Sequence, residues 1–429
     1  MNSLAGRSGD GGGRGQVLYV LADLPDPPRG GNDLRYSQNL RMLAELGWQV
    51  HVVAGAARAD RARAGVGDHA QLVRAVPIPP SRTNAVDRVR RVAGIARGAV
   101  SRVPVDPWAQ AHRAAGFDAA VLEVARGIRP DALVIRSLFA HLIPQLRRFT
   151  GPIVVDLHDA DALQARALLG TVPPLARPGI LLRLGAARRA ERLLRVADEL
   201  WVTSRVEADY LGARGIRTPS ILVRNAVAVA GTAPARGEPS PELLLVAGYG
   251  YPPNLAAAER LVEEVLPLVR RSVEARVTLV GRDLPLETAR RWSSLPGVAV
   301  LGAVDDLSGH LERAAGVVFL PSWSTGTPLK IAEALAYGLP LVANSIAVAG
   351  LEGLRDGEHF LLADSSRAAA KQVVRLITDR CLHRRLVAAG WAYARGTLSY
   401  DAALHAVATQ SVMGRVRAVQ RREFGPRTG

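Results

Sequence analysis

Residues 317–343 read VVFLPSWSTGTPLKIAEALAYGLPLVA and contain the pattern that decides the fold. The apolar run 317–320 predicts a strand, and the small polar residues after it predict a loop. A helix pattern over residues 327–337 and a second short strand at 341–343 follow. This order of elements is typical of a parallel sheet, in which loops and helix N-termini gather at the carboxyl ends of the strands.

The loop inside this unit has the chemistry of an anion site. Thr327 suits the N-cap of the predicted helix, and Pro328 suits its first helical position. Together with Thr327, the residues Ser324, Thr325 and Gly326 offer hydroxyl and backbone N–H groups beside the positive end of the helix dipole. We therefore predict that these four residues bind the diphosphate of a donor molecule.

Two charged residues on the predicted helix sharpen this hypothesis. Lys330 lies in the first turn, where a positive charge opposes the helix dipole unless an anion binds nearby. Glu333 follows three residues later on the same face, where its carboxylate can accept hydrogen bonds from a ribose. The alternative is an intrahelical Lys–Glu pair worth at most about 0.5 kcal/mol. We expect both side chains to face the gap between two domains.

The alternation of short apolar runs and helix patterns predicts two such domains in one α/β protein. The Gly- and Pro-rich stretch 231–241 separates two series of predicted strands, as a linker does. The predicted division is a disordered tail 1–15, an N-terminal Rossmann-like acceptor domain 16–230, the linker 231–241, a C-terminal Rossmann-like nucleotide-sugar domain 242–399, and a C-terminal helix with a basic tail 400–429. In the last part we expect one helix from Tyr400 to Arg422.

Positive charge dominates the composition. The formal net charge is +16, and Lys330 and Lys371 are the only lysines, so arginine supplies nearly all of it. Either a general preference for arginine codons or a basic surface that meets phosphates explains this. The segment Arg82–Arg102 mixes six arginines with Val, Ile and Ala. It predicts either a helix on an anionic membrane surface or an ordinary solvated face.

The location of the protein follows from what the sequence lacks. Cys381 is the only cysteine, which excludes a disulfide framework and fits a reducing compartment. The sequence contains no run of about eighteen apolar residues, so it predicts no membrane span. We expect a cytoplasmic protein, peripheral at the inner membrane face if Arg82–Arg102 binds lipid.

Several motifs resemble those of family 4 glycosyltransferases. They are VAGYGYPPN at 246–254, VTLVGRDLP at 277–285, VAVLGAVDDLSGHLERA at 298–314 and the stretch 321–340. RGGNDLRYSQNLRMLAELGWQVHVV at 29–53 is similar to the N-terminal glycine turn and first helix of that family. The resemblance covers residues 16 to about 404. It implies two Rossmann-like domains facing across a cleft (the glycosyltransferase B fold), a nucleotide-sugar donor of UDP or GDP type, retention at the anomeric carbon, and neither metal nor cofactor.

The resemblance also implies roles for single residues. Glu333 matches the glutamate that binds the donor ribose, and Thr325 stands where the family often has a second glutamate. His158 resembles the active-site histidine that contacts the donor sugar near the reacting carbon. Gly30 and Gly31 match a turn that lets the backbone approach the ligand, although an ordinary turn is the alternative.

Three further interpretations concern the surroundings of these residues. The loop 248–251 lacks the cations that the family often has there, so we expect Arg282 to assist Lys330 with the diphosphate. Asp159 is a candidate acceptor contact. The carboxylates of Asp156, Asp159 and Asp161 are close together in the sequence, but this group offers no firm third ligand for a metal ion. We therefore predict no metal site there.

These observations predict a hexosyltransferase-type glycosyltransferase that modifies a glycolipid, a polysaccharide precursor or a small molecule. Besides a sugar-nucleotide epimerase on the same fold, two alternatives stay open. One is a catalytically degenerate transferase fold that acts as a scaffold, because the acid at position 325 is missing. The other is a basic nucleic-acid-binding protein. An aromatic content of 5% offers few side chains on which nucleic-acid bases could stack, so no nucleic-acid partner is expected.

Overall fold

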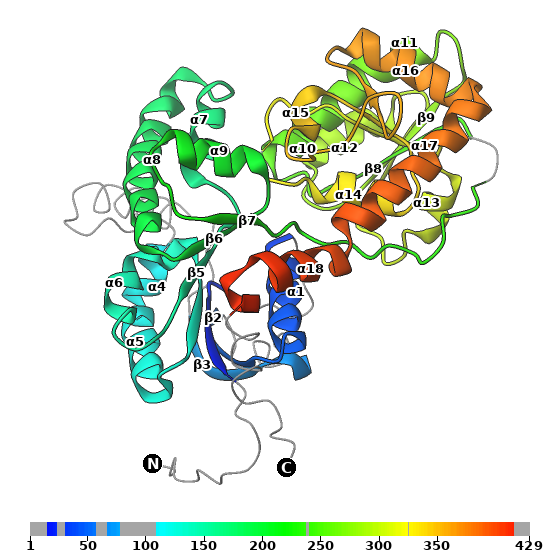
Figure 1. The fold of residues 1–429 in the computed structure, drawn as a ribbon. Helices are drawn as coiled ribbons and strands as arrows, with labels where there is room; N and C mark the ends of the chain where they lie inside the picture. The colour runs from blue at the N-terminus through cyan, green and yellow to red at the C-terminus, as the bar shows by residue number, and fades with distance from the viewer. Residues whose placement is uncertain are drawn as a thin grey trace, which may run out of the picture.

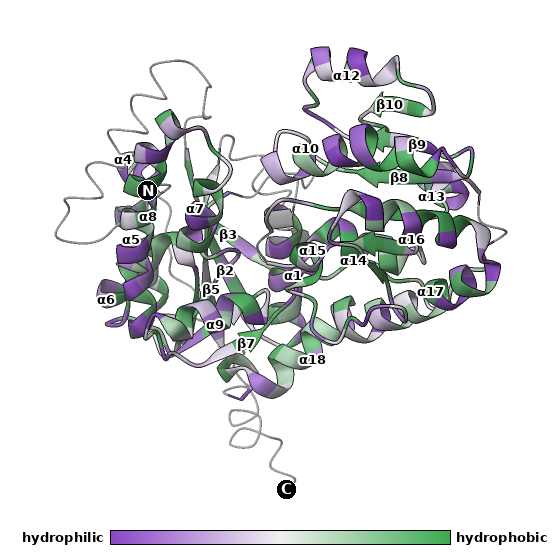
Figure 2. Cartoon of the chain, turned by 90° about the horizontal axis from the view of Figure 1, so that it is seen from above, coloured by the Kyte–Doolittle hydropathy of each residue, from purple (hydrophilic) through white to green (hydrophobic). Residues whose placement is uncertain are grey.

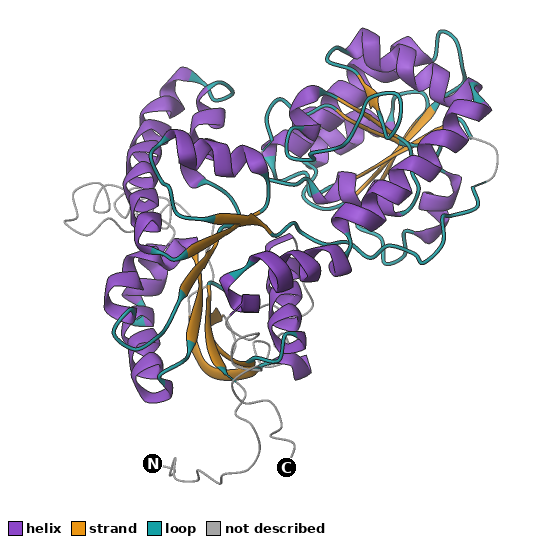
Figure 3. Ribbon diagram, in the orientation of Figure 1, coloured by secondary structure: helices purple, strands orange, loops and turns teal. Residues whose placement is uncertain are grey.

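The computed structural model describes residues 15–23, 31–56, 67–77, 109–236, 240–324 and 326–415. Two α/β domains lie side by side (Figure 1). In each of them the strands run through the middle and helices cover both faces (Figure 3). The predicted α/β class is confirmed.

The N-terminal domain is built on a parallel sheet with strand order β3-β2-β1-β4-β5-β6-β7 in the described part of the chain. Side chains of β1 alternate between two buried clusters, with Val17 and Tyr19 on one face and Leu18 and Val20 on the other. The strands are β1 (Gln16–Leu21), β2 (Gln49–Ala56), β3 (Gln71–Pro77), β4 (Ala132–Arg136), β5 (Ile153–Asp156), β6 (Glu199–Val202) and β7 (Ser220–Leu222).

Helices pack on both faces of this sheet because each face is apolar. The helices of this domain are α1 (Gly31–Glu45), α4 (Gln110–Ala114), α5 (Phe117–Ile128), α6 (Ile143–Leu146), α7 (Asp161–Leu169), α8 (Arg177–Ala190) and α9 (Arg205–Ala213). Phe117 and Phe139 stack at 4.6 Å between ring centroids beneath α5. The helices α7 and α8 pack on each other around a smaller cluster that includes Ala162, Ala165, Leu184 and Ala187.

The C-terminal domain contains two short parallel sheets, β10-β9-β8 and β11-β12-β13, joined by a bridge between Leu243 and Gly316. Its strands are β8 (Glu242–Val246), β9 (Arg276–Val280), β10 (Val298–Gly302), β11 (Val317–Phe319), β12 (Leu341–Ala343) and β13 (Leu361–Leu362). Its helices are α10 (Pro252–Glu259), α11 (Leu266–Val269), α12 (Leu286–Ser293), α13 (Ser308–Arg313), α14 (Leu329–Ala336), α15 (Ser345–Val348), α16 (Ser366–Thr378) and α17 (Arg380–Tyr393).

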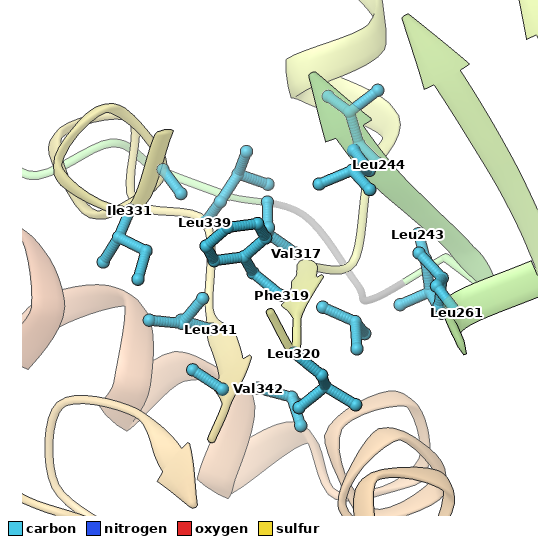
Figure 4. Close-up of a cluster of buried hydrophobic side chains, with 14 of the residues drawn as sticks. Leu243, Leu244, Leu261, Val317, Phe319, Leu320, Ile331, Leu339, Leu341 and Val342 are labelled. Atoms are coloured by element: carbon cyan, nitrogen blue, oxygen red, sulfur yellow. The ribbon is translucent and has the colours of Figure 1, made fainter. Parts of the chain in front are cut away.

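A single apolar cluster holds this second domain together. Figure 4 shows its centre, where Leu243 and Leu244 of β8 lie near Val317 and Phe319 of β11, with Ile331 of α14 on one side. In Figure 2 the strands β8 and β9 are hydrophobic while hydrophilic residues colour much of the outer helix α12. Because α14 belongs to this core, the position of its first turn is fixed by packing.

The end of the chain crosses back to the N-terminal domain. Helix α18 (Tyr400–Gln410) packs against α1, and Ala403, Val407 and Met413 belong to a buried cluster of that domain. The predicted single helix from Tyr400 to Arg422 is interrupted. Helix α18 ends at Gln410, the hydroxyl of Ser411 donates to buried Glu199 at 2.5 Å, and residues 412–415 are helical again. Residues 416–429, which contain the rest of the predicted helix, lie outside the described part.

Two segments carry the chain between the domains, and they lie next to each other. Val227, on the outward segment, donates its N–H to the carbonyl of Leu398 at 2.9 Å and pairs with Ser399 on the return segment. The described helices include none with the length and apolarity of a membrane span. The predicted lipid-binding segment Arg82–Arg102 is outside the described residues. Cys381 is exposed and unpaired.

We predict that removing the Met413 side chain loosens the returning segment. Met413 is fully buried, and its carbonyl accepts a hydrogen bond from the indole of Trp48 at 3.3 Å. Met413→Ala should lower the free energy of unfolding by about 2–5 kcal/mol through the cavity that it leaves. Urea unfolding measures this change. The control His405→Ala removes an exposed side chain of α18 and should shift the curve by less than about 0.5 kcal/mol.

Candidate functional site

Helix α14 begins at the carboxyl end of β11, and its start differs from the prediction by one residue. Pro328 is the N-cap and Leu329 the first helical residue, so the predicted capping role of Thr327 is wrong. Thr327 is buried, and its hydroxyl donates to the carbonyl of Thr203 in the N-terminal domain at 3.0 Å. The hydroxyl that would have capped the helix therefore connects the two domains.

The first two turns of α14 line a small pocket in the C-terminal domain. Lys330 and Glu333 both border it, so the predicted pair shares one cavity. Its volume is about 100 Å³, well below the roughly 300–1,000 Å³ of ligand pockets that enclose a whole small molecule. The remaining walls come mainly from apolar residues of β8, β11, α13 and α14: Leu244, Leu245, Val246, Leu307, Leu311, Val317, Ala334, Tyr337 and Leu339.

Lys330 is held inside its own domain. Its ammonium donates to the side-chain oxygen of Asn254 at 2.7 Å and lies 4.4 Å from the centre of the Phe319 ring. This contact ties Lys330 to the first turn of α10, which follows β8 in the same domain. Burial lowers the pKa of Lys330 to about 8, against the opposing influence of Glu333.

Glu333 lies beside this lysine without pairing to it. Its side chain is half-buried, and no hydrogen bond or ion pair from the described residues reaches its carboxylate. Burial raises the pKa of Glu333, and the charge of Lys330 only partly offsets that effect. The intrahelical ion pair that was the alternative interpretation is therefore not formed.

Two loops at the carboxyl ends of β8 and β9 are locked together beside the pocket. Gly281 has a φ of 142°, and a Cβ at this position would lie 1.7 Å from the carbonyl oxygen of Ala247. Tyr249 donates its N–H to the carbonyl of Arg282 at 2.8 Å. Arg282 is exposed at this junction, next to the loop 248–251 that it was predicted to complement.

The N-terminal domain contributes a buried polar network centred on Asp156 at the end of β5. The Asp156 carboxylate accepts from Nε of Arg35 in α1 at 2.8 Å, from the hydroxyl of Tyr19 at 2.5 Å and from Asn39 at 2.9 Å, and it pairs with Nη2 of Arg35 at 2.6 Å. His158 Nε2 lies 3.0 Å from the same carboxylate. Burial favours the neutral acid, but the charge of Arg35 and these donors hold the pKa of Asp156 well below its usual range.

Both ring nitrogens of His158 are engaged in this network. Arg136 donates to Nδ1, which places the remaining ring proton on Nε2, facing Asp156. Burial and the neighbouring Arg136 charge lower the pKa of His158 to about 3, so the ring is neutral at pH 7. The ring also packs against Tyr36 at 4.9 Å between centroids. In this arrangement neither nitrogen is available to the sugar contact that the resemblance implied.

The predicted donor loop touches the N-terminal domain immediately beside this network. Gly326 has a φ of 64°, and a Cβ there would lie 2.9 Å from the hydroxyl oxygen of Thr203 and 3.5 Å from a carboxylate oxygen of Asp159. Thr203 also donates to Glu207 at 2.6 Å, and burial together with the Asp159 charge raises the pKa of Glu207. Asp159 is thus brought to the domain junction, as a residue in contact with an acceptor would be.

Glu352 ties the two domains together a short distance away. Its carboxylate pairs with the guanidinium of Arg224 and accepts the backbone N–H of Arg205 at 2.8 Å. Its carbonyl accepts a hydrogen bond from the hydroxyl of Tyr393 at 3.0 Å. These polar contacts hold the carboxyl ends of both sheets close to one another.

Of the remaining predicted site residues, some lie outside the part of the chain that the structure describes. Gly30 and Thr325 lie outside the described residues, while Gly31 is the first residue of α1. Ser324 is half-buried in the loop. Within the described ranges no three His, Cys, Asp or Glu side chains are grouped as metal ligands would be.

Sequence reasoning missed three residues that shape the site. Asn254 holds Lys330, Arg136 fixes the orientation of His158, and Tyr337 forms part of the pocket wall. Asn254 was visible in the motif at 246–254, where its side chain now donates to the carbonyl of Gly248 at 2.8 Å. No local pattern marked Arg136, because its partners lie on β5 and α1.

A family model matches the C-terminal domain by sequence. Residues 240–379 match the family model described as "Glycosyl transferases group 1". The C-terminal domain is therefore similar to group 1 glycosyltransferases. No curated protein sequence matches the chain.

Solved structures extend the likeness to the whole fold. Sucrose-phosphate synthase from Thermosynechococcus elongatus superposes with a TM-score of 0.64 at 16% identity, over 95% of this chain and 99% of that one. TarM gives 0.67 at 10% identity, over 91% and 97%. HepE from Anabaena, solved with UDP and glucose, gives 0.60 at 14% identity, over 92% and 98%. The predicted glycosyltransferase B fold of two Rossmann-like domains is thereby confirmed.

We predict that Asp156 is essential for the stability of the N-terminal domain. Asp156→Ala leaves the buried Arg35 charge without its partner and should cost about 3–5 kcal/mol in urea unfolding at pH 7. Asp209→Ala, which removes an exposed acid from α9, is the matched control and should have little effect.

The stabilisation by Asp156 has a defined pH dependence, which the isosteric substitution Asp156→Asn tests. The pKa of Asp156 is lower in the folded chain than in the unfolded chain, so its stabilising effect is complete above about pH 4 and is lost as the pH falls further. The gap between wild type and Asp156→Asn should therefore narrow below about pH 4. A gap that stays constant down to pH 2 would contradict this account.

Proposed function

We propose that this protein transfers a sugar from a nucleotide-diphosphate donor to an acceptor hydroxyl. One observation carries the proposal: Lys330 and Glu333 line the same pocket, the lysine with a single neutral partner and the glutamate unpaired. A half-buried ammonium that has no ion-pair partner gains most from an anionic ligand. The match of residues 240–379 to group 1 glycosyltransferases supports a nucleotide sugar as that ligand.

We place the nucleoside end of the donor in the pocket and the diphosphate at the start of α14. The apolar walls from β8 and α13 suit a base, and the pocket volume suits one part of the donor but not the whole molecule. Glu333 would bind the ribose hydroxyls. The diphosphate would lie against Lys330, the helix N-terminus and the loop 324–327, with Arg282 at the edge.

The proposed reaction breaks the bond between the anomeric carbon and the diphosphate oxygen and forms a bond from that carbon to the acceptor oxygen. The electron pair of the broken bond leaves with the nucleoside diphosphate, which Lys330 stabilises, and the acceptor proton passes to the departing phosphate. We propose retention of anomeric configuration and no requirement for a metal or cofactor. Hexosyl transfer is our preferred specificity, from a UDP or GDP donor.

The N-terminal domain would supply the acceptor side, with boundaries at residues 16–230 against 242–399 for the donor domain. Asp159 at the junction is our candidate for an acceptor contact. We assign His158 a positioning role, because its neutral ring connects Arg136 to Asp156 beneath the junction. Acceptors under this proposal are a glycolipid, a polysaccharide precursor or a small molecule. The single cysteine favours a cytoplasmic location.

We expect Lys330→Ala to abolish most of the transferase activity. Turnover of a UDP- or GDP-sugar should fall about 10²-fold, and the affinity for the free nucleoside diphosphate about tenfold or more. Lys371→Ala is the ideal control, since it removes the only other lysine, an exposed residue of α16. Calorimetry with UDP and GDP together with a donor-consumption assay tests both statements. Equal activity of the two variants would refute the assignment.

The affinity for the nucleoside diphosphate should also depend on pH through this lysine. With its pKa lowered to about 8, Lys330 loses its charge as the pH rises through that value. Wild-type affinity for the nucleoside diphosphate should therefore fall between about pH 7 and 9. The profile of Lys330→Ala should be flat over the same range.

A second substitution tests the ribose contact separately. Glu333→Ala should weaken UDP binding about tenfold and remove the preference for UDP over 2′-deoxy-UDP, because hydrogen bonds to a charged group contribute about 1.5–3 kcal/mol. Calorimetric titration of both nucleotides against both proteins measures this. A variant that still discriminates between them would place the ribose elsewhere.

A further inference from the structure

The hairpin of α7 and α8 exposes three leucines. Leu175, in the turn between the two helices, is 97% exposed, while Leu181 and Leu182 of α8 are 54% and 46% exposed. The leucines of α8 border a surface groove with Gly185 and Arg189. Three exposed leucines within eight residues of the chain differ from the singly scattered apolar side chains of an ordinary surface.

The charge around these leucines has one sign. Between Asp161 and Glu191 the sequence contains five arginines and no acid. Arg177 and Arg188 are exposed, whereas Arg183 turns inward to Asp161 at 3.1 Å. The acids at the two ends of this segment add little negative charge to its surface, since Glu191 is buried and Asp161 is paired with Arg183. Exposed leucine beside exposed arginine is the composition of a helix that lies on an anionic lipid surface.

The hairpin is placed where such a surface would serve the proposed transfer. Helix α7 starts at Asp161, three residues after His158. Its nine residues span about 13 Å, and the turn with Leu175 follows the end of α7 that is remote from Asp159. In Figures 1 and 2 the helix α8 lies on the side of the N-terminal domain away from the C-terminal domain. A bilayer on this hairpin would leave the domain junction uncovered.

We propose that the α7–α8 hairpin docks the protein on an anionic lipid bilayer, with Leu175, Leu181 and Leu182 inserted at the headgroup level and the arginines on lipid phosphates. A second copy of the chain is a poor occupant, because two arginine-rich faces repel each other. A nucleic acid would use the arginines but leave the leucines without a role. The inference is independent of the proposed donor site, since no residue of the hairpin contacts Lys330 or Glu333.

The test compares vesicle binding of the full-length chain and of Leu175→Glu/Leu181→Glu. We expect wild type to float with vesicles containing about one-third phosphatidylglycerol and to bind phosphatidylcholine vesicles at least tenfold more weakly. The double variant should bind the anionic vesicles at least about tenfold less than wild type. Leu286→Glu is the matched control, because Leu286 is 76% exposed on α12 in the other domain, and it should bind as wild type does.

Two further measurements distinguish a loss of lipid binding from a loss of folding. Calorimetric affinity for UDP or GDP should be the same in wild type and in the double variant, which shows that the variant is folded and that vesicle binding fails separately from the donor site. Should neither protein bind a nucleotide, matching urea unfolding curves serve the same purpose. Wild type that binds no anionic vesicles, or a double variant that binds them fully, would overturn the proposal. A change in oligomeric state caused by the double variant without lipid would assign the leucines to a protein interface instead.

Discussion

The buried carboxylate of Asp156 is the constraint on which the N-terminal half of the structure depends. It ends β5, compensates the charge of Arg35 from α1 and accepts from Tyr19 of β1, so three elements meet on one pair of oxygens. Arg35 extends this network to the end of β7, because it donates to the carbonyl of Val223 at 2.5 Å, just after that strand. Burying such a pair is costly unless every partner is in place. The same requirement fixes where His158 and Arg136 lie.

Much of the fold could be predicted from the sequence, because it depends on local periodicity. The alternation of apolar runs and helix patterns gave the parallel strands, and the loop before α14 marked the pocket with Lys330 and Glu333. What could not be predicted are the partners that tertiary packing brings together. Thr327 looked like an N-cap because its hydroxyl can bond locally, yet Thr203 lies 124 positions away in the sequence and takes that hydroxyl.

The role of His158 could not be predicted from the sequence for the same reason. A histidine after a buried strand can face a ligand or a buried network, and the local sequence is the same in both cases. The outcome is decided by Arg136, which comes from the neighbouring strand β4 in register with Asp156. Likewise, the periodicity of α8 predicts a helix but not which of its leucines stay uncovered. That depends on the extent of α7, which covers Leu184 and Ala187 but not Leu181.

The two domains are stabilised separately, and this explains why the proposed donor site can lie almost wholly in one of them. The large apolar cluster of the C-terminal domain includes β8, β11 and α14, while α18 completes a cluster of the N-terminal domain. The contacts described between the domains are polar, such as the partly exposed ion pair of Glu352 with Arg224 and the buried hydrogen bond of Thr327 with Thr203. Lys330 therefore owes its position to the core beneath α14, and its unfavourable burial is tolerated because that core is independent of the junction. A site built on such a core keeps its charge in place whether or not the second domain closes on it.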